Sequence, residues 1–184
     1  MDNILTLASG INVMHLQLQL KRNPQLWNTR TERTQSPESP HREVSDIWLR
    51  YSGGAFEDSR KPHESVWFDS ADLLSEVKKH ARHVMTLVQG DALGGILITR
   101  IPPGGKVYPH VDGGWNAETF DKFALQIASH QQQAFCYADG QHVTMPGDLY
   151  WFNNQESHWV INDSPVERIT MIVCVKLDKP FGGL

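Results

Sequence analysis

The sequence has little cysteine, no long apolar run and no excess of positive charge. Only two cysteines occur in 184 residues, Cys136 and Cys174. Both lie in apolar, strand-like runs, so we expect buried, reduced thiols rather than a disulfide framework. No apolar run approaches the roughly 20 residues that cross a membrane. The first residues, MDNILTLASGINVM, lack the basic start of a secretory signal, which predicts a cytoplasmic protein.

Several catalytic motifs are missing as well. The sequence contains no glycine-rich phosphate loop, no serine nucleophile elbow and no Cys-x-x-Cys pair, so hydrolases and nucleotide-dependent enzymes have no positive support. The net charge of −4 argues against a binder of duplex nucleic acid, which normally presents a basic surface. Hydrophobic residues make up 40% and charged residues 21%, as in ordinary globular proteins. A chain of 184 residues suits a single domain, and its oligomeric state stays open.

The first ninety residues predict a layer of strands, one loop and one helix. Residues 13–20, VMHLQLQL, alternate leucine with glutamine, which predicts a strand with one buried face. Residues 46–51, DIWLRY, predict another strand. The polar residues 28–45 contain two prolines and predict a long loop, which either covers a binding site or is a solvated linker.

The helix is predicted at residues 70–87, SADLLSEVKKHARHVMTL. Apolar residues recur there at helical spacing, with charged residues largely opposite. Asp69 or Ser70 is suited to cap its first turn. His80 and His83 lie near the polar face, so we expect both to be solvated rather than to bind a metal.

From Gly94 onward, short strand-like segments alternate with turns rich in glycine, proline and aspartate. The segments are 94–101, 106–112, 122–129, 133–138, 142–145, 149–152, 157–162 and 168–177. Short strands at this spacing are typical of a sandwich or barrel. The prediction is therefore a mainly β fold, with a barrel-like core at about 93–178 and an N-terminal strand-and-helix layer at 1–92.

Three side chains in this core are suited to hold a metal ion. His110 and Asp112 are two residues apart in a strand-like segment, so both project from one face. Taken alone, such a pair is better explained as a surface histidine beside a turn. His158, which opens a later segment, adds a second imidazole. Two imidazoles and one carboxylate form the facial set of non-haem Fe(II) oxygenases, which leaves positions open for a co-substrate and dioxygen.

Arg168 follows His158 by ten residues and begins the apolar run RITMIVCVK. A charged residue in such a strand is seldom buried without an anionic partner, and guanidinium binds a carboxylate with two hydrogen bonds. Thr170, on the same face, is suited to add a hydroxyl donor. The alternative is an arginine at the edge of the strand that points to solvent.

These segments resemble the aspartyl/asparaginyl β-hydroxylase family of 2-oxoglutarate oxygenases. In IPPGGKVYPHVD, a His-x-Asp pair follows a Pro-Gly turn. In GDLYWFNNQESHWVINDSPVERI, a Gly-acidic-aromatic strand and an Asn-Asn turn precede a histidine, with an asparagine four residues on and an arginine ten on. The resemblance covers roughly residues 93–176, and the first ninety residues match chiefly at DIWLR.

The resemblance implies a double-stranded β-helix, or cupin-like, fold. It also implies Fe(II) held by His110, Asp112 and His158, and the distal carboxylate of 2-oxoglutarate held by Arg168. The implied reaction uses dioxygen to convert 2-oxoglutarate to succinate and CO2 while a C–H bond is hydroxylated. The implied substrate is a protein side chain of the Asp or Asn type or a free amino acid.

The sequence departs from the family pattern at one position. The family often has a basic-x-His triplet whose histidine helps to hold 2-oxoglutarate, whereas this chain has Lys122-Phe123-Ala124. The second carboxylate contact is then left to Gln126 or Thr170, or is absent.

Two further interpretations concern residues near these motifs. Trp115 follows a Gly-Gly pair and is the best candidate for a substrate contact, whereas Trp151 is expected to pack in the core. His41, like three other histidines, has no interpretable spacing and is assigned a surface or structural role. Two other functions stay open: a cupin-like binding or structural protein without turnover, and a metal-dependent cupin enzyme that uses no 2-oxoglutarate.

Overall fold

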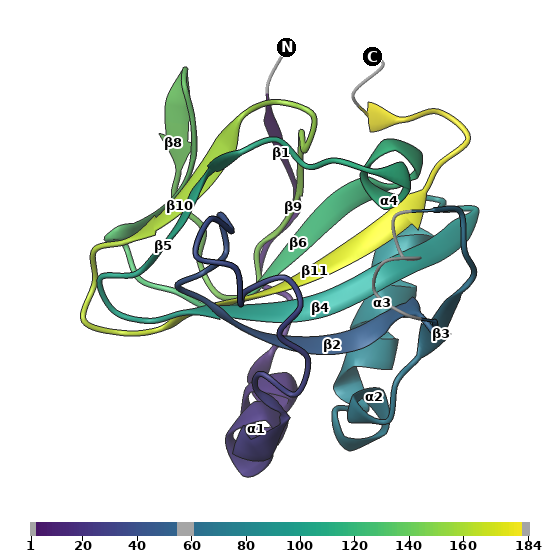
Figure 1. Cartoon of the computed structure of the whole chain (residues 1–184), viewed down its shortest axis with the longest axis horizontal. Helices are drawn as coiled ribbons and strands as arrows, with labels where there is room; N and C mark the ends of the chain where they lie inside the picture. Colours follow the sequence, from purple (N-terminus) through teal and green to yellow (C-terminus); the bar gives the residue numbers. More distant parts are fainter. Residues whose placement is uncertain (1–2, 55–60, 182–184) are drawn as a thin grey trace.

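The computed structural model describes residues 3–54 and 61–181, which form two antiparallel β-sheets (Figure 1). The larger sheet has the order β1 (Ile4–Ala8), β9 (Leu149–Phe152), β6 (Asp121–Ala128), β11 (Arg168–Lys176), β4 (Ala92–Ile101), β2 (Ser45–Ser52) and β3 (Ser65–Trp67). The smaller sheet has the order β5 (Lys106–His110), β10 (His158–Asn162), β7 (Gln133–Tyr137) and β8 (Gly140–His142).

The strands from β4 onward wind between the two sheets. Strands β4, β6, β9 and β11 lie in the larger sheet, and β5, β7, β8 and β10 lie in the smaller one. This arrangement is a double-stranded β-helix, so the mainly β, cupin-like fold predicted from the sequence is confirmed. Each predicted segment of this core contributes to a strand, although 142–145 overlaps β8 only at His142.

Alternate residues of β11 face two different apolar clusters. Met171, Val173 and Val175 belong to the cluster that includes the helices. Ile172 packs against the cluster that contains residues of both sheets. Because side chains alternate along a strand, Arg168 and Thr170 share the face of Ile172 and point between the sheets. The predicted co-substrate residues are therefore inside the β-helix.

The helices α1 (Met14–Arg22), α2 (Ser70–Leu73) and α3 (Glu76–Leu87) lie on the side of the larger sheet away from the smaller one (Figure 1). A short 3₁₀ helix (Pro24–Leu26) follows α1, and α4 (Trp115–Thr119) lies after β5. None of the helices in the described part of the chain is long and apolar enough to span a membrane.

The strand predicted at residues 13–20 is wrong, because this segment forms helix α1. Leu16 and Leu20 are four residues apart and both are buried, whereas Leu18 between them is 44% exposed. In a run of eight residues, alternating leucines match the strand period and the helix period almost equally well. Contact with the core decides for the helix, since only one of its faces meets the larger sheet.

The helical structure of α1 predicts that alanine substitutions at Leu16 and Leu18 differ strongly in their effect on stability. Leu16→Ala is expected to lower the free energy of unfolding by roughly 2–5 kcal/mol, because the fully buried side chain leaves a cavity. Leu18→Ala is expected to change it by less than about 0.5 kcal/mol. Urea unfolding of both variants tests this, and equal losses would contradict the helix and favour the strand.

The predicted helix at 70–87 is interrupted. It divides into α2 and α3, with Leu74 and Ser75 between them. Neither Asp69 nor Ser70 caps it through a side chain, because the Ser70 hydroxyl instead donates to the carbonyl of Trp48 at 2.5 Å. His83 is exposed as predicted.

The expected solvation of His80 is wrong. Its side chain is buried at 8% exposure and faces the core with Val77, Ala81 and Val84 of the same helix. His80 lies three residues after Val77 and four before Val84, so helical spacing puts it on the buried face. The strand predicted at 46–51 is confirmed as β2, and Cys136 and Cys174 are buried and unpaired, as predicted.

Candidate metal centre and cavity

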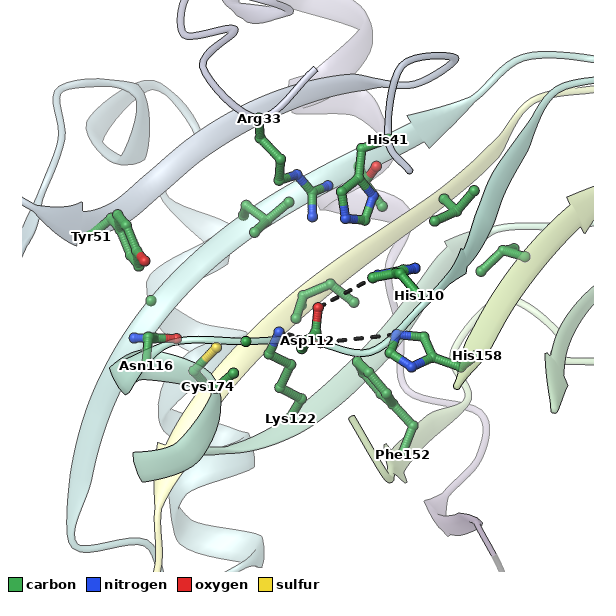
Figure 2. A pocket seen from close by; sticks show the side chains of 18 of the residues that line it. Arg33, His41, Tyr51, His110, Asp112, Asn116, Lys122, Phe152, His158 and Cys174 are labelled. Atoms are coloured by element: carbon green, nitrogen blue, oxygen red, sulfur yellow. Dashed lines mark hydrogen bonds and ion pairs between the residues drawn. The ribbon is translucent and has the colours of Figure 1, made fainter. Parts of the chain in front are cut away.

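The three predicted ligands meet at the end of the smaller sheet. His110 ends β5, His158 begins β10, and the two residues are direct partners in the antiparallel ladder, with ring centroids 4.4 Å apart. Asp112 turns back over both. Its Oδ1 is 3.5 Å from His110 Nε2, and its Oδ2 is 3.9 Å from His158 Nε2 (Figure 2).

Backbone carbonyls orient both histidines. Nδ1 of His110 bonds the carbonyl of Tyr108 at 2.8 Å, and Nδ1 of His158 bonds the carbonyl of Glu156 at 2.9 Å. A carbonyl only accepts, so Nδ1 carries the proton in both rings. The Nε2 atom that faces Asp112 is then free to bind a metal. Histidine ligands in metalloproteins are held in this way by their second nitrogen.

The charge states of the cluster also suit a metal. Burial lowers the pKa of His158 to about 4, so this imidazole is neutral near pH 7. Burial would raise the pKa of Asp112, but Lys122 and His110 outweigh it and hold the pKa well below its usual range. Lys122 Nζ lies 2.5 Å from Asp112 Oδ2, so Oδ1 is the carboxylate oxygen that faces His110 without a lysine. A neutral imidazole and an ionised carboxylate are the forms that bind metal.

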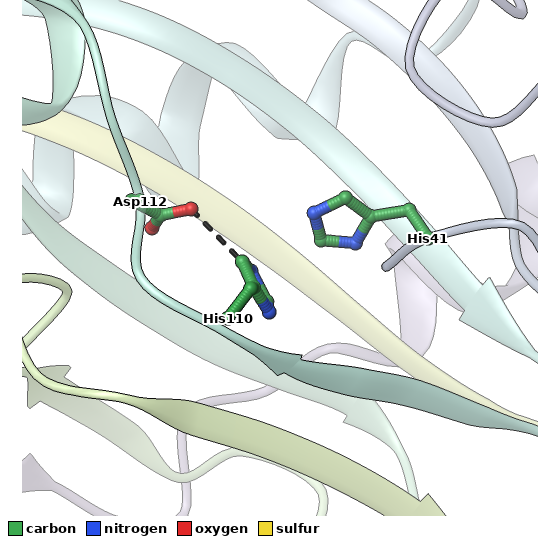
Figure 3. A group of neighbouring side chains, drawn as sticks. All are labelled: His41, His110 and Asp112. Atoms are coloured by element: carbon green, nitrogen blue, oxygen red, sulfur yellow. Dashed lines mark ion pairs between the residues drawn. The ribbon is translucent and has the colours of Figure 1, made fainter. Parts of the chain in front are cut away.

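A third histidine joins the cluster from the loop at 28–45. Ligand atoms of His41, His110 and Asp112 all lie within 4.8 Å of one another (Figure 3). The surface or structural role predicted for His41 missed this position. The only sequence feature that pointed here was the loop itself, whose alternative interpretation was a cover over a binding site. The 28–45 loop does cover the site, since Arg33 and His41 both line the cavity described below.

Two sets of ligands are therefore available, with either His158 or His41 as the second imidazole. His158 lies on a strand and its ring is fixed by the Glu156 carbonyl. His41 lies on a loop, and its Nδ1 is buried without a hydrogen-bond partner in the described residues. The set of His110, Asp112 and His158 is thus the better oriented one.

The Fe(II) affinity of alanine variants distinguishes these two ligand sets. His158→Ala is expected to weaken Fe(II) binding at least about 100-fold, because even changes to groups behind a ligand cost 10–100-fold. His41→Ala is expected to leave Fe(II) binding within a few-fold of the wild type. Equilibrium dialysis of both variants against Fe(II) measures this, and the reverse order would assign the metal to His41.

A cavity of about 260 Å³ adjoins the three predicted ligands. Its walls come from the inner faces of both sheets, from the 28–45 loop and from α4. From the ligand cluster it extends toward Tyr51, Asn116 and Cys174 (Figure 2). Trp115 is not among the lining residues, because it packs between His63 and Phe120. Its role as a substrate contact stays a prediction, while its neighbour Asn116 reaches the cavity.

Arg168 is buried between the sheets at 2% exposure, which excludes the solvent-facing alternative. Its guanidinium donates to the hydroxyls of Thr144 and Tyr150, each at 3.2 Å. No carboxylate within residues 3–54 or 61–181 pairs with it. Burial lowers the pKa of Arg168, the expected sign for a desolvated cation. Arg168 does not line the cavity, but Tyr150 connects the two, since its ring packs against Phe135 of the cavity wall at 6.1 Å.

Gln126 and Thr170 are engaged within the protein. Gln126 donates to the carbonyl of Ile169 at 2.9 Å, and its Oε1 accepts from Thr144 at 2.8 Å and from Thr170 at 3.3 Å. Thr144 in turn accepts from Arg168. The network therefore orients the guanidinium, and the single hydroxyl proton of Thr170 is already used. Its role in binding the co-substrate stays a prediction. Ala124 packs in the core between the sheets and offers no polar contact.

Two asparagines of the sequence motif hold turns around the site. Asn162, four residues after His158, donates through Nδ2 to the carbonyls of Pro102 and Val166, both at 2.9 Å. Asn154 donates to the carbonyl of Ala117 at 3.0 Å, and its own carbonyl accepts from the backbone N–H of Asp112 at 3.1 Å. These bonds fix the chain on either side of the ligands.

No protein-family model and no curated protein matches the sequence. Solved structures match its fold. A viral collagen prolyl hydroxylase of Paramecium bursaria Chlorella virus-1, in complex with 2OG, is 9% identical, covers 97% of each chain and has a TM-score of 0.58. A prolyl-4-hydroxylase of Pseudomonas putida is 12% identical, covers 96% of this chain and 94% of its own, and has a TM-score of 0.54.

A 2OG-Fe(II) oxygenase-family oxidoreductase of Burkholderia pseudomallei, at 12% identity and a TM-score of 0.54, covers 85% of this chain and 77% of its own. The chain has the fold of 2OG-Fe(II) oxygenases. Identities this low show the fold alone. Membership of the aspartyl/asparaginyl β-hydroxylase family therefore stays a prediction, and the activity rests on the site.

Proposed function

We propose that this protein is an Fe(II)- and 2-oxoglutarate-dependent oxygenase. It hydroxylates a C–H bond of a protein side chain of the Asp or Asn type, or of a free amino acid. The observation that carries the proposal is the pair of strand-borne histidines, His110 and His158, whose Nε2 atoms are aimed at Asp112.

The residues present fit Fe(II) better than a structural zinc ion. His110, Asp112 and His158 would hold the metal and leave other positions open. A closed zinc site favours cysteine thiolates. Of the two cysteines, Cys174 alone lines the cavity, which is too few thiols for a closed zinc site, and burial raises its pKa to about 11.

Arg168 fits the distal carboxylate of 2-oxoglutarate. It is a buried cation with only hydroxyl partners in the described residues, and a carboxylate would supply its missing counter-charge. Binding there requires the rings of Tyr150 and Phe135 to move, since they lie at the boundary between the cavity and Arg168. The Tyr150 hydroxyl accepts from Arg168 and has its own proton to donate, so it would add a hydrogen bond to the carboxylate.

When bound, Fe(II) and 2-oxoglutarate supply the oxidising chemistry, in which 2-oxoglutarate and dioxygen yield succinate, CO2 and a hydroxylated substrate. The chain's own residues bind, orient and exclude water. Apolar side chains of the cavity, among them Phe135, Phe152 and Val160, keep water from the reacting atoms. The 28–45 loop closes the opposite side through Arg33 and His41.

Removal of the metal tests this function. The purified protein, supplied with Fe(II), ascorbate, dioxygen and 2-oxoglutarate, is expected to release succinate and CO2 in equal amounts. Release should cease with a chelator and return with added Fe(II), because the oxidation needs the metal. Asparagine and aspartate, free and in peptides, are to be included as substrates. Metal loading without succinate under any of these conditions would contradict the proposal.

A second candidate is a cupin-like binding protein without turnover, and the ion pair of Lys122 with Asp112 favours it. A lysine ammonium can take the place of a metal as the counter-charge of this carboxylate. In that case the wild type binds little Fe(II), and Lys122→Met gains binding. If the protein is an oxygenase, the wild type already binds Fe(II) without this substitution. A cupin enzyme that uses no 2-oxoglutarate would instead keep its activity in Arg168→Met.

A further inference from the structure

A histidine of the 28–45 loop lies beside two of the predicted metal ligands. The ligand atoms of His41, His110 and Asp112 are within 4.8 Å of one another, and the His41 imidazole points from the loop toward the other two side chains (Figure 3). Its ring meets that of His110 edge to face, with centroids 4.7 Å apart. Two atoms bound to one ion, each at roughly 2.1 Å, are at most about 4.2 Å apart. A small movement therefore brings all three around one ion.

Contacts on both sides of His41 fix its backbone against β5, the strand that carries the first predicted ligand. The Tyr108 backbone N–H donates to the carbonyl of Pro40 at 2.8 Å. The Tyr108 hydroxyl donates to the Glu43 carboxylate, and the Arg42 guanidinium lies over the Tyr108 ring, 3.3 Å from its centroid. These contacts place the imidazole over the cluster. It can leave by a change of rotamer while the backbone of the loop stays in place.

The ring nitrogens of His41 are available to a metal ion. Its Nδ1 has no hydrogen-bond partner within residues 3–54 and 61–181, whereas Nδ1 of His110 and of His158 each bonds a backbone carbonyl. Because no such bond fixes the tautomer of His41, either of its nitrogens can present a lone pair. Burial lowers the pKa of His41 well below its usual range, so this imidazole is neutral near pH 7. Neutral imidazole is the form that binds metal.

The number of coordination positions decides when His41 can be bound. An octahedral ion held by His110, Asp112 and His158 has three open positions. The reaction needs all of them, since 2-oxoglutarate binds through two oxygen atoms and dioxygen takes the third. His41 would fill one of these positions. It is therefore compatible with the metal centre before the co-substrate binds, and it has to leave for the reaction.

We propose that His41 is a displaceable fourth ligand, which fills an open position of the metal centre until 2-oxoglutarate binds. This inference rests on the proposed function, because the molecule that displaces His41 is the co-substrate of that function. His41 thus competes with 2-oxoglutarate for the metal. Its loss costs little metal affinity, because a water molecule can take the same position.

The number of imidazoles bound to the metal tests this role. Co(II) in place of Fe(II) moves the ring protons of each bound histidine far outside the normal range of the NMR spectrum, and its complex with 2-oxoglutarate does not turn over. The wild type with Co(II) is expected to show three bound histidines, and two after 2-oxoglutarate is added. His41→Ala should show two in both states. His83→Ala, on the exposed side of α3, is the control and should behave as the wild type.

His41→Ala is also expected to bind 2-oxoglutarate more tightly than the wild type. A competing ligand lowers the apparent affinity in proportion to the fraction of molecules in which the position is open. With that fraction at about one tenth, loss of His41 raises the affinity of the Co(II) protein about 10-fold. Calorimetry measures this gain. His41→Phe, which keeps an aromatic ring but offers no lone pair, should show the same gain, whereas loss of a merely structural histidine would not raise the affinity.

The results separate this role of His41 from the proposed function. A wild type with only two bound histidines before 2-oxoglutarate is added, or a third that persists in both His41 variants, would exclude His41 as a ligand. A third histidine that stays bound in the 2-oxoglutarate complex, or an unchanged affinity in both variants, would exclude its displacement. A Co(II) protein that does not bind 2-oxoglutarate would contradict the oxygenase instead, and the count of bound histidines would still decide whether His41 is a ligand. A wild type that binds no Co(II) would overturn both.

Discussion

His110→Ala is expected to abolish both Fe(II) binding and turnover. His110 contacts both of the other predicted ligands, the Asp112 carboxylate at 3.5 Å and the His158 ring, whose centroid is 4.4 Å from its own. Loss of a ligand should weaken metal binding at least about 100-fold. Metal content by elemental analysis and succinate release measure the two effects.

The matched control is His83→Ala, on the exposed side of α3. It removes the same side chain away from the cavity and should keep metal and activity. His110→Ala with near-normal turnover would refute the metal assignment, provided that its unfolding midpoint matches that of the control.

Arg168→Met is expected to raise the KM for 2-oxoglutarate strongly while leaving metal content unchanged. Loss of a buried charge-assisted contact costs roughly 2–5 kcal/mol, which corresponds to about 30-fold to 5000-fold in affinity. The free energy of unfolding should rise or stay unchanged in this variant. The guanidinium is desolvated without a carboxylate partner among the described residues, so an apolar side chain of similar length removes an unfavourable burial.

A loss of affinity for 2-oxoglutarate without a loss of stability distinguishes a ligand-binding arginine from a structural one. Arg100→Met is the control, because Arg100 is a half-exposed arginine of β4 that pairs with Glu167 at 3.4 Å. It should change neither quantity much. A marked loss of stability in Arg168→Met, with an unchanged KM for 2-oxoglutarate, would show that Arg168 serves the fold alone.

The sequence was most informative where local pattern and tertiary contacts agree. Glycine- and proline-rich turns delimit the strands from β4 onward, and each apolar segment between them is long enough to cross a sheet once. The spacing of His110 and Asp112 predicted one face of a single strand, whereas β5 ends at His110 and Asp112 lies in the segment that follows it. Arg168 was recognisable because it is a charged residue at the start of an apolar strand.

Other features depend on contacts that no local pattern contains. The segment at 13–20 has too few residues for its period to be decided, and packing against the larger sheet makes it α1. His41 reaches the metal cluster only through the path of the 28–45 loop. The cavity itself forms only where β2, β4 and α4 meet.

The most direct test of the central claim is an anaerobic titration of the purified protein with Fe(II) and 2-oxoglutarate, followed by visible absorption. A weak metal-to-ligand charge-transfer band is expected only when both are present. It should be missing in His110→Ala and should need far more 2-oxoglutarate in Arg168→Met. Bound Fe(II) without any band would contradict an oxygenase and favour a cupin that does not use 2-oxoglutarate, and a wild type that binds no Fe(II) would favour the binding protein.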